Sequence, residues 1–287
     1  MNRVDLMAPA VSARRRRSRR RRSRTAVVVV AAIVVATVGT VLGLKAVRSG
    51  SVVTPACTVT GAANHRYTVS PEQAQNAAII AAVAQKDQLP DHAVTVAEAV
   101  SLQEARLTNL PYGDRDSVGL FQQRPSQGWG TEAQLLDSTY AASAFYRRLA
   151  QIPGWQALPV TQAAQAVQLS AAPRAYEVWE DEARALAIAL TGEVAAGLSC
   201  HFNGFGGAAP SPGAVGQALV GERGANLLGV PVSNTTGWQT ASWAVAHAYA
   251  YHLKSVSFAG QTWQSRSGKW APDHGRHDPR VVTVAVG

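Results

Sequence analysis

One uncharged apolar segment, residues 26–44, divides this chain more sharply than any other feature. It contains nineteen residues, mainly Val and Ala. At about 1.5 Å per residue, a helix of this length nearly spans a hydrocarbon core of about 30 Å. A signal peptide has a shorter apolar region of about 7–15 residues, followed by a small-residue cleavage site. We therefore expect a retained transmembrane anchor over residues 26–47, with a cleaved signal peptide as the alternative.

The basic charge of the chain lies immediately before this segment. Nine arginines fall between Arg14 and Arg24, and they equal the formal net charge of the whole chain, +9. Positive residues beside an anchor stay on the cytoplasmic side, so we predict a cytoplasmic tail at residues 1–25 and an extracytoplasmic chain after residue 47. Topology and attraction to anionic lipid account for the arginines, and we expect no nucleic-acid partner.

Two cysteines, Cys57 and Cys200, lie on the side that we predict to be external. In an oxidising compartment we expect them to form a disulfide, and two separate thiols are the alternative. Residues 48–69 surround the first cysteine. They are rich in Ser, Thr and Pro and show little periodicity, so we predict a linker there.

The clearest helix start lies at Ser70, which is a good N-cap. Pro71 suits the first helical position and Gln73 completes a capping-box pattern. Hydrophobic periodicity and breakers then predict about six short helices, among them those at residues 71–88, 93–107, 138–149, 161–168 and 173–192. Together these helices predict a mainly α domain over residues 70–200.

The rest of the chain reads as a linker and a second unit. Residues 201–215 are rich in Gly, Ala and Pro, which is typical of a flexible linker. Residues 216–287 predict a small α+β module, with a helix at 238–253 and strands at 255–259 and 281–286.

Two groups of residues in this module are candidate binding sites. Trp238 and Trp243 either stack on sugar rings or pack in a core, and both interpretations stay open. A group of histidines and aspartates lies near the C-terminus, but its spacing matches no established ligand pattern. We therefore predict no metal or other cofactor for the group Asp273, His274, His277 and Asp278.

Glu104 lies near the end of the predicted helix 93–107, in a run rich in Ala and Val. A carboxyl group held against apolar side chains has its charged form disfavoured, so its pKa rises and it can donate a proton near neutral pH. Glu104 is therefore a candidate general acid, and an ordinary exposed helix glutamate is the alternative.

The residues after Glu104 carry a more specific pattern. Gly113-Asp114-Arg115 precedes Gly119-Leu120-Phe121-Gln122, and the run continues to Gly-Trp-Gly at residues 128–130. This pattern resembles the lysozyme superfamily, in particular the soluble lytic transglycosylases and goose-type lysozymes, and it is similar to membrane-anchored bacterial members. The resemblance covers roughly residues 70–192. It implies a lysozyme-like helical domain that cleaves peptidoglycan between N-acetylmuramic acid and N-acetylglucosamine, with Glu104 as the general acid.

The resemblance leaves hydrolase and transglycosylase chemistry open. A hydrolase uses a second carboxylate, for which Asp114 and Asp116 are the candidates, whereas a transglycosylase uses one glutamate and a hydroxyl of the sugar. The aspartate that goose-type enzymes carry two residues after the Gln falls on Arg124 here, which favours a transglycosylase. We expect Arg124 to pair with one of these aspartates or to contact a peptide carboxylate. Turn formation is the other explanation for both aspartates.

The resemblance also implies substrate-binding residues in the cleft, namely Ser117, Gln122, Gln123, Gln168 and Tyr176. Gln168 stands where the family has an asparagine, and helix surface or core packing is the alternative for it and for Tyr176. Ala105 replaces the usual serine beside the acid. We therefore retain a second hypothesis, a non-catalytic cell-wall-binding or scaffold protein that keeps the lysozyme fold.

Overall fold

The computed structural model describes residues 54–61, 65–170, 172 and 174–287. The predicted tail at residues 1–25 and the predicted anchor at residues 26–47 lie outside this part of the chain. Among the residues that are described, none of the helices combines the length and the apolar character needed to cross a membrane. The part of the chain from Thr54 to Gly287 forms one compact unit.

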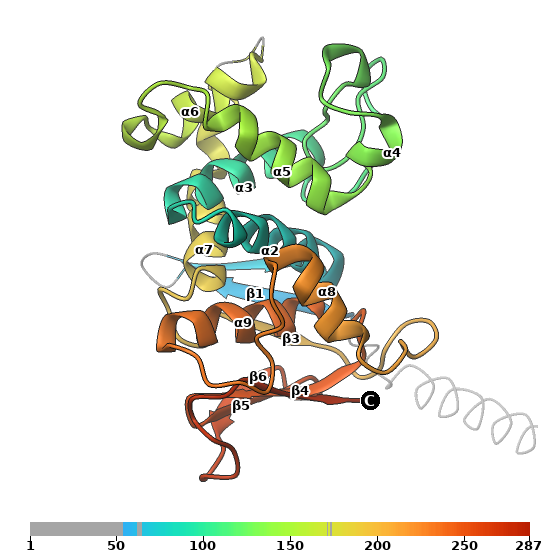
Figure 1. Ribbon diagram of the computed structural model, residues 1–287, viewed down its shortest axis with the longest axis vertical. Helices are drawn as coiled ribbons and strands as arrows, with labels where there is room; N and C mark the ends of the chain where they lie inside the picture. The colour runs from blue at the N-terminus through green and yellow to red at the C-terminus, as the bar shows by residue number, and fades with distance from the viewer. Residues whose placement is uncertain (1–53, 62–64, 171, 173) are drawn as a thin grey trace, which may run out of the picture. The chain divides into compact units, whose positions relative to one another are not determined.

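This unit is a mixed α+β fold, with eight helices and two small antiparallel sheets in its described residues (Figure 1). The prediction of a mainly α fold with a small α+β module is therefore confirmed in part: the predicted helices of residues 70–168 are present, but a first sheet that was not predicted lies beside them. The difference comes from short strands that pair over long sequence separations. Such strands leave little periodicity of their own in the sequence.

The first sheet has the order β2-β1-β3, from strands Arg66–Val69, Ala56–Thr60 and Leu198–His201. Strands β1 and β2 lie within the stretch that was predicted to be a linker. Cys57 lies directly opposite Cys200 in the antiparallel pairing of β1 with β3, and the predicted disulfide between them is confirmed. The disulfide joins the segment before α2 (Pro71–Lys86) to the segment after α7 (Glu180–Leu190).

Helix α2, Pro71–Lys86, is the central helix of the unit. Its predicted start is confirmed: Ser70 and Gln73 form a capping box, with Pro71 in the first turn. Its alanines and isoleucines are buried on almost every side, because α2 is covered by other helices all round. The small Ala side chains allow these neighbours to approach closely. The neighbours of α2 are α3 (Asp91–Ala105), α5 (Ser138–Leu149), α7 (Glu180–Leu190), α8 (Ala214–Arg223) and α9 (Asn234–His247).

Helices α3, α5 and α6 (Val160–Gln168) form the end of the unit that carries the predicted site, together with the short α4 (Glu132–Leu135) (Figure 1). The predicted helix 173–192 is shorter than expected, since α7 begins only at Glu180. The residues before it form turns and the 3-10 helix Glu177–Trp179. Tyr176 is fully buried at this point and is not helical.

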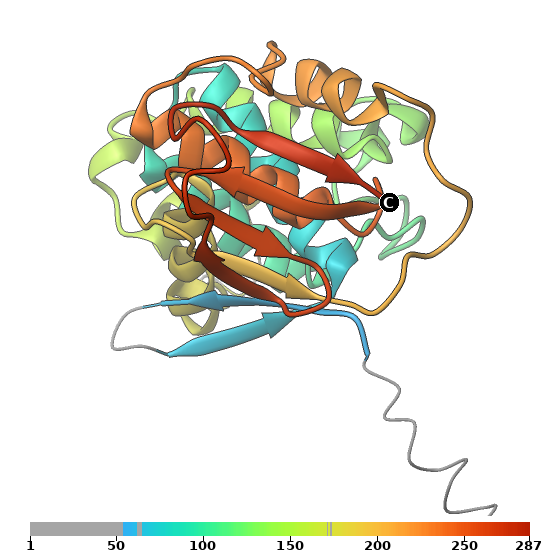
Figure 2. The ribbon, with the colours of Figure 1, turned by 90° about the horizontal axis from the view of Figure 1, so that it is seen from below.

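The second sheet has the order β6-β5-β4-β7, from strands Lys269–Pro272, Gln261–Gln264, Leu253–Phe258 and Thr283–Val286. Helix α9 packs on β4 and also against α2 and α7, and Figure 2 shows this sheet in front of the helices. The division into a domain at residues 70–200 and a module at 216–287 stays a prediction. The contacts of α2 with α8 and α9 nevertheless join these two parts in one core.

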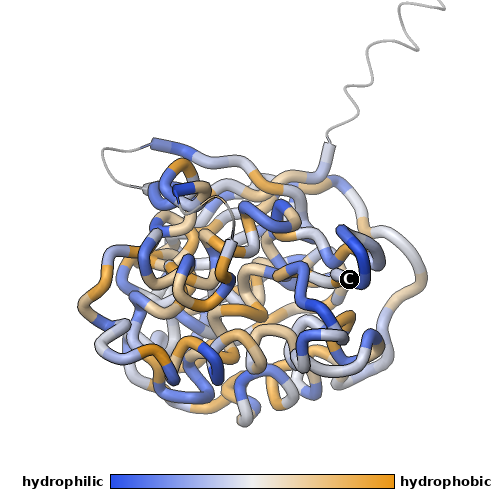
Figure 3. The backbone as a smooth tube through the Cα atoms, turned by 90° about the horizontal axis from the view of Figure 1, so that it is seen from above, coloured by the Kyte–Doolittle hydropathy of each residue, from blue (hydrophilic) through white to orange (hydrophobic). Residues whose placement is uncertain are grey.

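The core runs through both parts of the unit. Figure 3 shows apolar segments passing through the middle of the unit and hydrophilic segments in many of its outer loops. Trp238 and Trp243 are buried, which confirms the core-packing alternative for both. Trp238 meets Phe258 edge to face, and a side chain at Gly237 would collide with that same ring.

Candidate functional site

Glu104 lies in the last turn of α3, where the chain leaves the helix abruptly. Arg106 and Leu107 both adopt a left-handed conformation, with φ of 52° and 55°. Two side chains of α2 hold this reversal, because the Gln73 amide donates to the Arg106 carbonyl and the Asn76 amide donates to the Leu107 carbonyl, each at 2.8 Å. The central helix thus fixes the position of Glu104.

Glu104 borders a cavity of about 450 Å³ that opens to solvent. Three further segments contribute to it: the loop after α3, the end of α5, and the end of α6 with the residues that follow. The other lining residues are Phe121, Gln122, Arg124, Gln127, Trp129, Arg148, Val167, Gln168, Leu169 and Ser170. Its volume lies in the range of small-molecule sites.

The Glu104 carboxyl group is partly buried and has one aromatic partner. The Tyr176 hydroxyl donates a hydrogen bond to Glu104 Oε1 at 3.0 Å. Burial raises the pKa of Glu104, and the hydrogen bond from Tyr176 opposes this increase without cancelling it. Burial, and then the charge of Glu104, also raise the pKa of Tyr176, so its hydroxyl stays protonated and available as a donor. An acid with a raised pKa keeps its proton to a higher pH than an exposed glutamate does, which favours proton donation into the cavity.

The Gly-Leu-Phe-Gln segment lies against the end of α6. The Gln168 amide donates to the Phe121 carbonyl at 3.1 Å, and both Gln122 and Gln168 line the cavity. Gln122 adopts a positive φ of 47°, with its amide near the carbonyls of Tyr112 and Gly119. A Cβ on Gly113 would lie 1.8 Å from Gln122 Oε1, so the glycine leaves room for this side chain.

The two candidate aspartates have different surroundings. Asp116 accepts hydrogen bonds from Arg124 Nε at 2.8 Å and from the backbone and hydroxyl of Ser126. Arg124, followed by Ser126, lowers the pKa of Asp116 well below its usual range. The side chain of Asp114 is 91% exposed and lies near Arg115. Among the described residues that line the cavity, Glu104 is the only carboxylate.

Ser117 and Gln123 lie inside the loop instead of on the cavity wall. Both are buried, and the Gln123 amide donates to the Ala141 carbonyl at 3.2 Å. The backbone of Gln123 pairs with that of Val118 in an isolated β-bridge. In this structure Gln123 holds the loop against α5 and Ser117 is buried within the loop, whereas both were predicted as cleft residues that bind substrate or position the loop.

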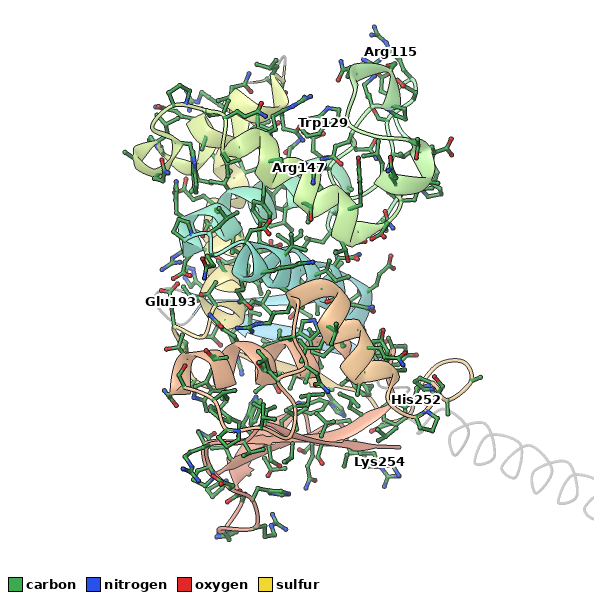
Figure 4. The ribbon with its side chains drawn as sticks, in the orientation of Figure 1. Arg115, Trp129, Arg147, Glu193, His252 and Lys254 are labelled. Atoms are coloured by element: carbon green, nitrogen blue, oxygen red, sulfur yellow. A yellow bond between two sulfur atoms is a disulfide. The ribbon has the colours of Figure 1, made fainter. Side chains whose placement is uncertain are left out.

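Two cavity residues, Trp129 and Arg148, were absent from the sequence prediction. The Arg148 guanidinium lies 3.6 Å from the centre of the Trp129 ring, and Figure 4 labels Trp129 in this region and Arg115 at the outer tip of the loop. Trp129 belongs to the Gly-Trp-Gly sequence at the end of the stretch that resembles the lysozyme superfamily, and this position could have indicated that it lies at the site. Nothing in the sequence indicated that Arg148 of α5 stacks on it.

Comparison of the chain with protein-family models and with curated proteins finds no match. The function is therefore argued from the residues around Glu104 and from their geometry.

Proposed function

We propose that this protein cleaves the glycan strand of peptidoglycan between N-acetylmuramic acid and N-acetylglucosamine, with Glu104 as the general acid. The observation that carries the proposal is the Glu104 carboxyl group, which has a raised pKa and faces a solvent-open cavity. The resemblance of the Gly-Leu-Phe-Gln region to lytic transglycosylases and goose-type lysozymes supplies the substrate class.

Glu104 begins the reaction by protonating the glycosidic oxygen as the bond breaks toward an oxocarbenium-like state. The carboxylate that results keeps the hydrogen bond from Tyr176, which stabilises its negative charge. The same carboxylate then removes a proton from a hydroxyl of the muramyl residue, whose oxygen closes an anhydro ring. Glu104 is thereby returned to its protonated state for the next cycle.

Transglycosylase chemistry fits the surroundings of Glu104 better than hydrolysis. A two-carboxylate glycosidase needs a second acid near the sugar, at about 5–9.5 Å from the first. Asp116 is bound to Arg124 and Ser126, and Asp114 is exposed in the loop. Neither aspartate is among the residues that line the cavity.

The remaining walls of the cavity suit a sugar chain. Gln122 and Gln168 bring amide groups that hydrogen-bond acetamido substituents, and Trp129 contributes an aromatic ring. The Cys57–Cys200 disulfide agrees with an oxidising, extracytoplasmic compartment. We place this unit outside the cytoplasmic membrane, anchored through residues 26–47, with residues 1–25 in the cytoplasm.

The test is digestion of purified peptidoglycan by the wild-type protein, by Glu104→Gln and by Asp114→Asn. We expect Glu104→Gln to lower the rate at least about 100-fold, because an amide cannot donate the proton that the leaving group needs. Asp114→Asn is the matched control and is expected to keep the wild-type rate. Anhydro ends among the products identify a transglycosylase, and reducing ends identify a hydrolase.

The second hypothesis, a non-catalytic wall-binding protein, predicts a different outcome. Wild type and Glu104→Gln would then both sediment with purified sacculi and release no fragments. The replacement of the family's serine by Ala105 favours this hypothesis, because it removes a hydroxyl beside the acid. Equal release of fragments by wild type and Glu104→Gln would remove Glu104 from the chemistry.

A further inference from the structure

A second cavity lies on the second sheet, among residues for which the proposed function has no role. Its volume is about 630 Å³, larger than that of the cavity beside Glu104. Val256 and Trp263 of this sheet are fully buried on the side of α9 and the first sheet, so by strand alternation their neighbours in sequence point to the opposite face. The cavity lies on that opposite face.

The floor of this cavity is a row of three side chains across the sheet. Gln264 of β5 pairs with Ser255 of β4, which pairs with Ala285 of β7. All three line the cavity, and two of them, Ser255 and Ala285, are small. The floor therefore offers a hydroxyl and an amide group to a ligand.

One wall comes from residues 202–205, within the stretch that was predicted to be a flexible linker. The backbone N–H of Phe202 donates to the Ser265 carbonyl at 3.0 Å, and the Phe202 ring is buried against Tyr249 and Trp263. Phe205 stacks on the His252 ring, with ring centres 4.8 Å apart. The wall is therefore built in advance, as is usual for small-molecule sites.

The charges around this cavity are all of one sign. Lys254 and Arg266 line it, and its lining residues include no Asp or Glu. Neither cation forms an ion pair with any acid in the part of the chain that the structure describes. Figure 4 labels Lys254 at the sheet. Two exposed cations beside a cavity without acids attract a negatively charged group.

We propose that this cavity binds a small organic anion. Its carboxylate or phosphate lies between Lys254 and Arg266, its ring or apolar part lies against Phe205, and its other polar groups bond to Ser255 and Gln264. Guanidinium and ammonium groups both bind either oxyanion. The site is independent of Glu104, because the two cavities share no residue.

Isothermal titration of the full chain with three probes tests this proposal. Hippurate carries an aromatic ring and a carboxylate, phenyl phosphate carries a ring and a phosphate, and hippuramide is the uncharged control. We expect at least one anionic probe to bind with a Kd on the order of 1 mM, as is usual for ligands of this size. A higher affinity for one of the two anions shows whether the site prefers a carboxylate or a phosphate. Equal affinities show that it recognises the negative charge and does not distinguish the two groups.

Variants locate the binding. Lys254→Gln and Arg266→Gln are each expected to weaken it about tenfold, because each removes one of the two charges. Lys269→Gln, an exposed cation of β6 that does not line the cavity, is the matched control and should bind as wild type does. Glu104→Gln should also bind normally, which separates this site from the proposed catalytic one. Absence of binding by both anions, equal binding of hippuramide, or equal affinity of all variants would overturn the proposal.

Discussion

Two glutamates at the ends of helices accept hydrogen bonds from aromatic side chains. They differ in how many side chains contact the carboxyl group and in whether it borders a cavity. Glu104, at the end of α3, accepts one hydrogen bond from Tyr176 and borders a cavity. Glu222, at the end of α8, is buried and accepts from Trp243 Nε1 at 2.6 Å, with His247 Nε2 at 3.2 Å. The oxygens of Glu222 are therefore occupied by side chains of α9, whereas Glu104 keeps capacity for a ligand.

The histidine beside Glu222 is held between that carboxyl group and the backbone of α9. His247 Nδ1 lies 2.9 Å from the Trp243 carbonyl, which can only accept, and Nε2 faces the Glu222 carboxyl group. The comparison teaches that full saturation by donors fixes a buried carboxyl group in a structural role. A single donor beside a cavity leaves the group free for proton transfer.

The strongest test of this difference is the loss of each carboxyl group in turn. We expect Glu222→Ala to lower the free energy of unfolding by about 1–3 kcal/mol for each buried group, Trp243 Nε1 and His247 Nε2, that it leaves without a hydrogen-bond partner. Glu104→Gln is the control, and we expect it to unfold at the same denaturant concentration as wild type or a higher one. Urea denaturation followed by circular dichroism measures both. A Glu222→Ala variant as stable as wild type would remove the structural half of the comparison.

A third glutamate, Glu98, lies on α3 six residues before Glu104. It is the opposite of Glu222, because its buried carboxyl group has no hydrogen-bond donor in the described part of the chain. It is fully buried, and neither of its carboxyl oxygens has a hydrogen-bond partner among the described residues. Burial raises the pKa of Glu98 well above its ordinary value. The folded state therefore holds a proton that the unfolded chain has already released, and stability declines as the pH rises from the unfolded pKa, about 4.3, toward the folded one.

The second prediction follows from this decrease of stability with rising pH. Glu98→Met keeps the approximate volume and removes the buried polar group. We expect the unfolding free energy at pH 8 to rise by about 1–3 kcal/mol, which is the range measured for unpaired buried polar groups. The gain should be smaller at pH 4, where Glu98 is largely neutral in both states. Thermal unfolding across pH 4–8 checks this, and an equal gain at every pH would contradict the assigned charge.

The sequence predicts those parts of the fold that depend on neighbouring residues. The capping box at Ser70, Pro71 and Gln73, and the helix that delivers Glu104, are local signals, and both are present in the structure. The pairing of β1 with β3 joins segments more than 130 residues apart. Its four- and five-residue strands carry no pattern that separates them from a linker. The disulfide was the one long-range contact that residue type alone indicated.

The candidate site divides in the same way. Glu104, Gln122 and Gln168 lie in or beside recognisable motifs, and the structure brings them to one cavity. The stacking of Arg148 on Trp129 depends on how α5 packs against the loop, and this geometry has no sequence signature. Tyr176 was predicted from a motif to contact substrate, and its bond to Glu104 appears only in three dimensions.

The smallest expected effect concerns the single donor on Glu104, and it tests whether that donor tunes the acid. Tyr176→Phe removes a hydrogen bond to the charged form of Glu104, so the pKa of Glu104 should rise further. A hydrogen bond to a charged group is worth about 1.5 kcal/mol, which corresponds to a shift of roughly one pH unit. Carbon-13 NMR titration of the Glu104 carboxyl group measures this shift without relying on activity.

The same change should appear in the proposed cleavage reaction. A general acid works only while it is protonated, so the alkaline limb of the rate profile should move to higher pH in Tyr176→Phe. Tyr140→Phe is the matched control, because its hydroxyl bonds to the Trp129 carbonyl and it is not among the groups that shift the pKa of Glu104. A limb that moves to lower pH, or that moves equally in both variants, would show that Tyr176 does not set the protonation of Glu104. In that case the Glu104 carboxyl group, which has one hydrogen-bond donor, would differ from Glu222 only because it borders the cavity.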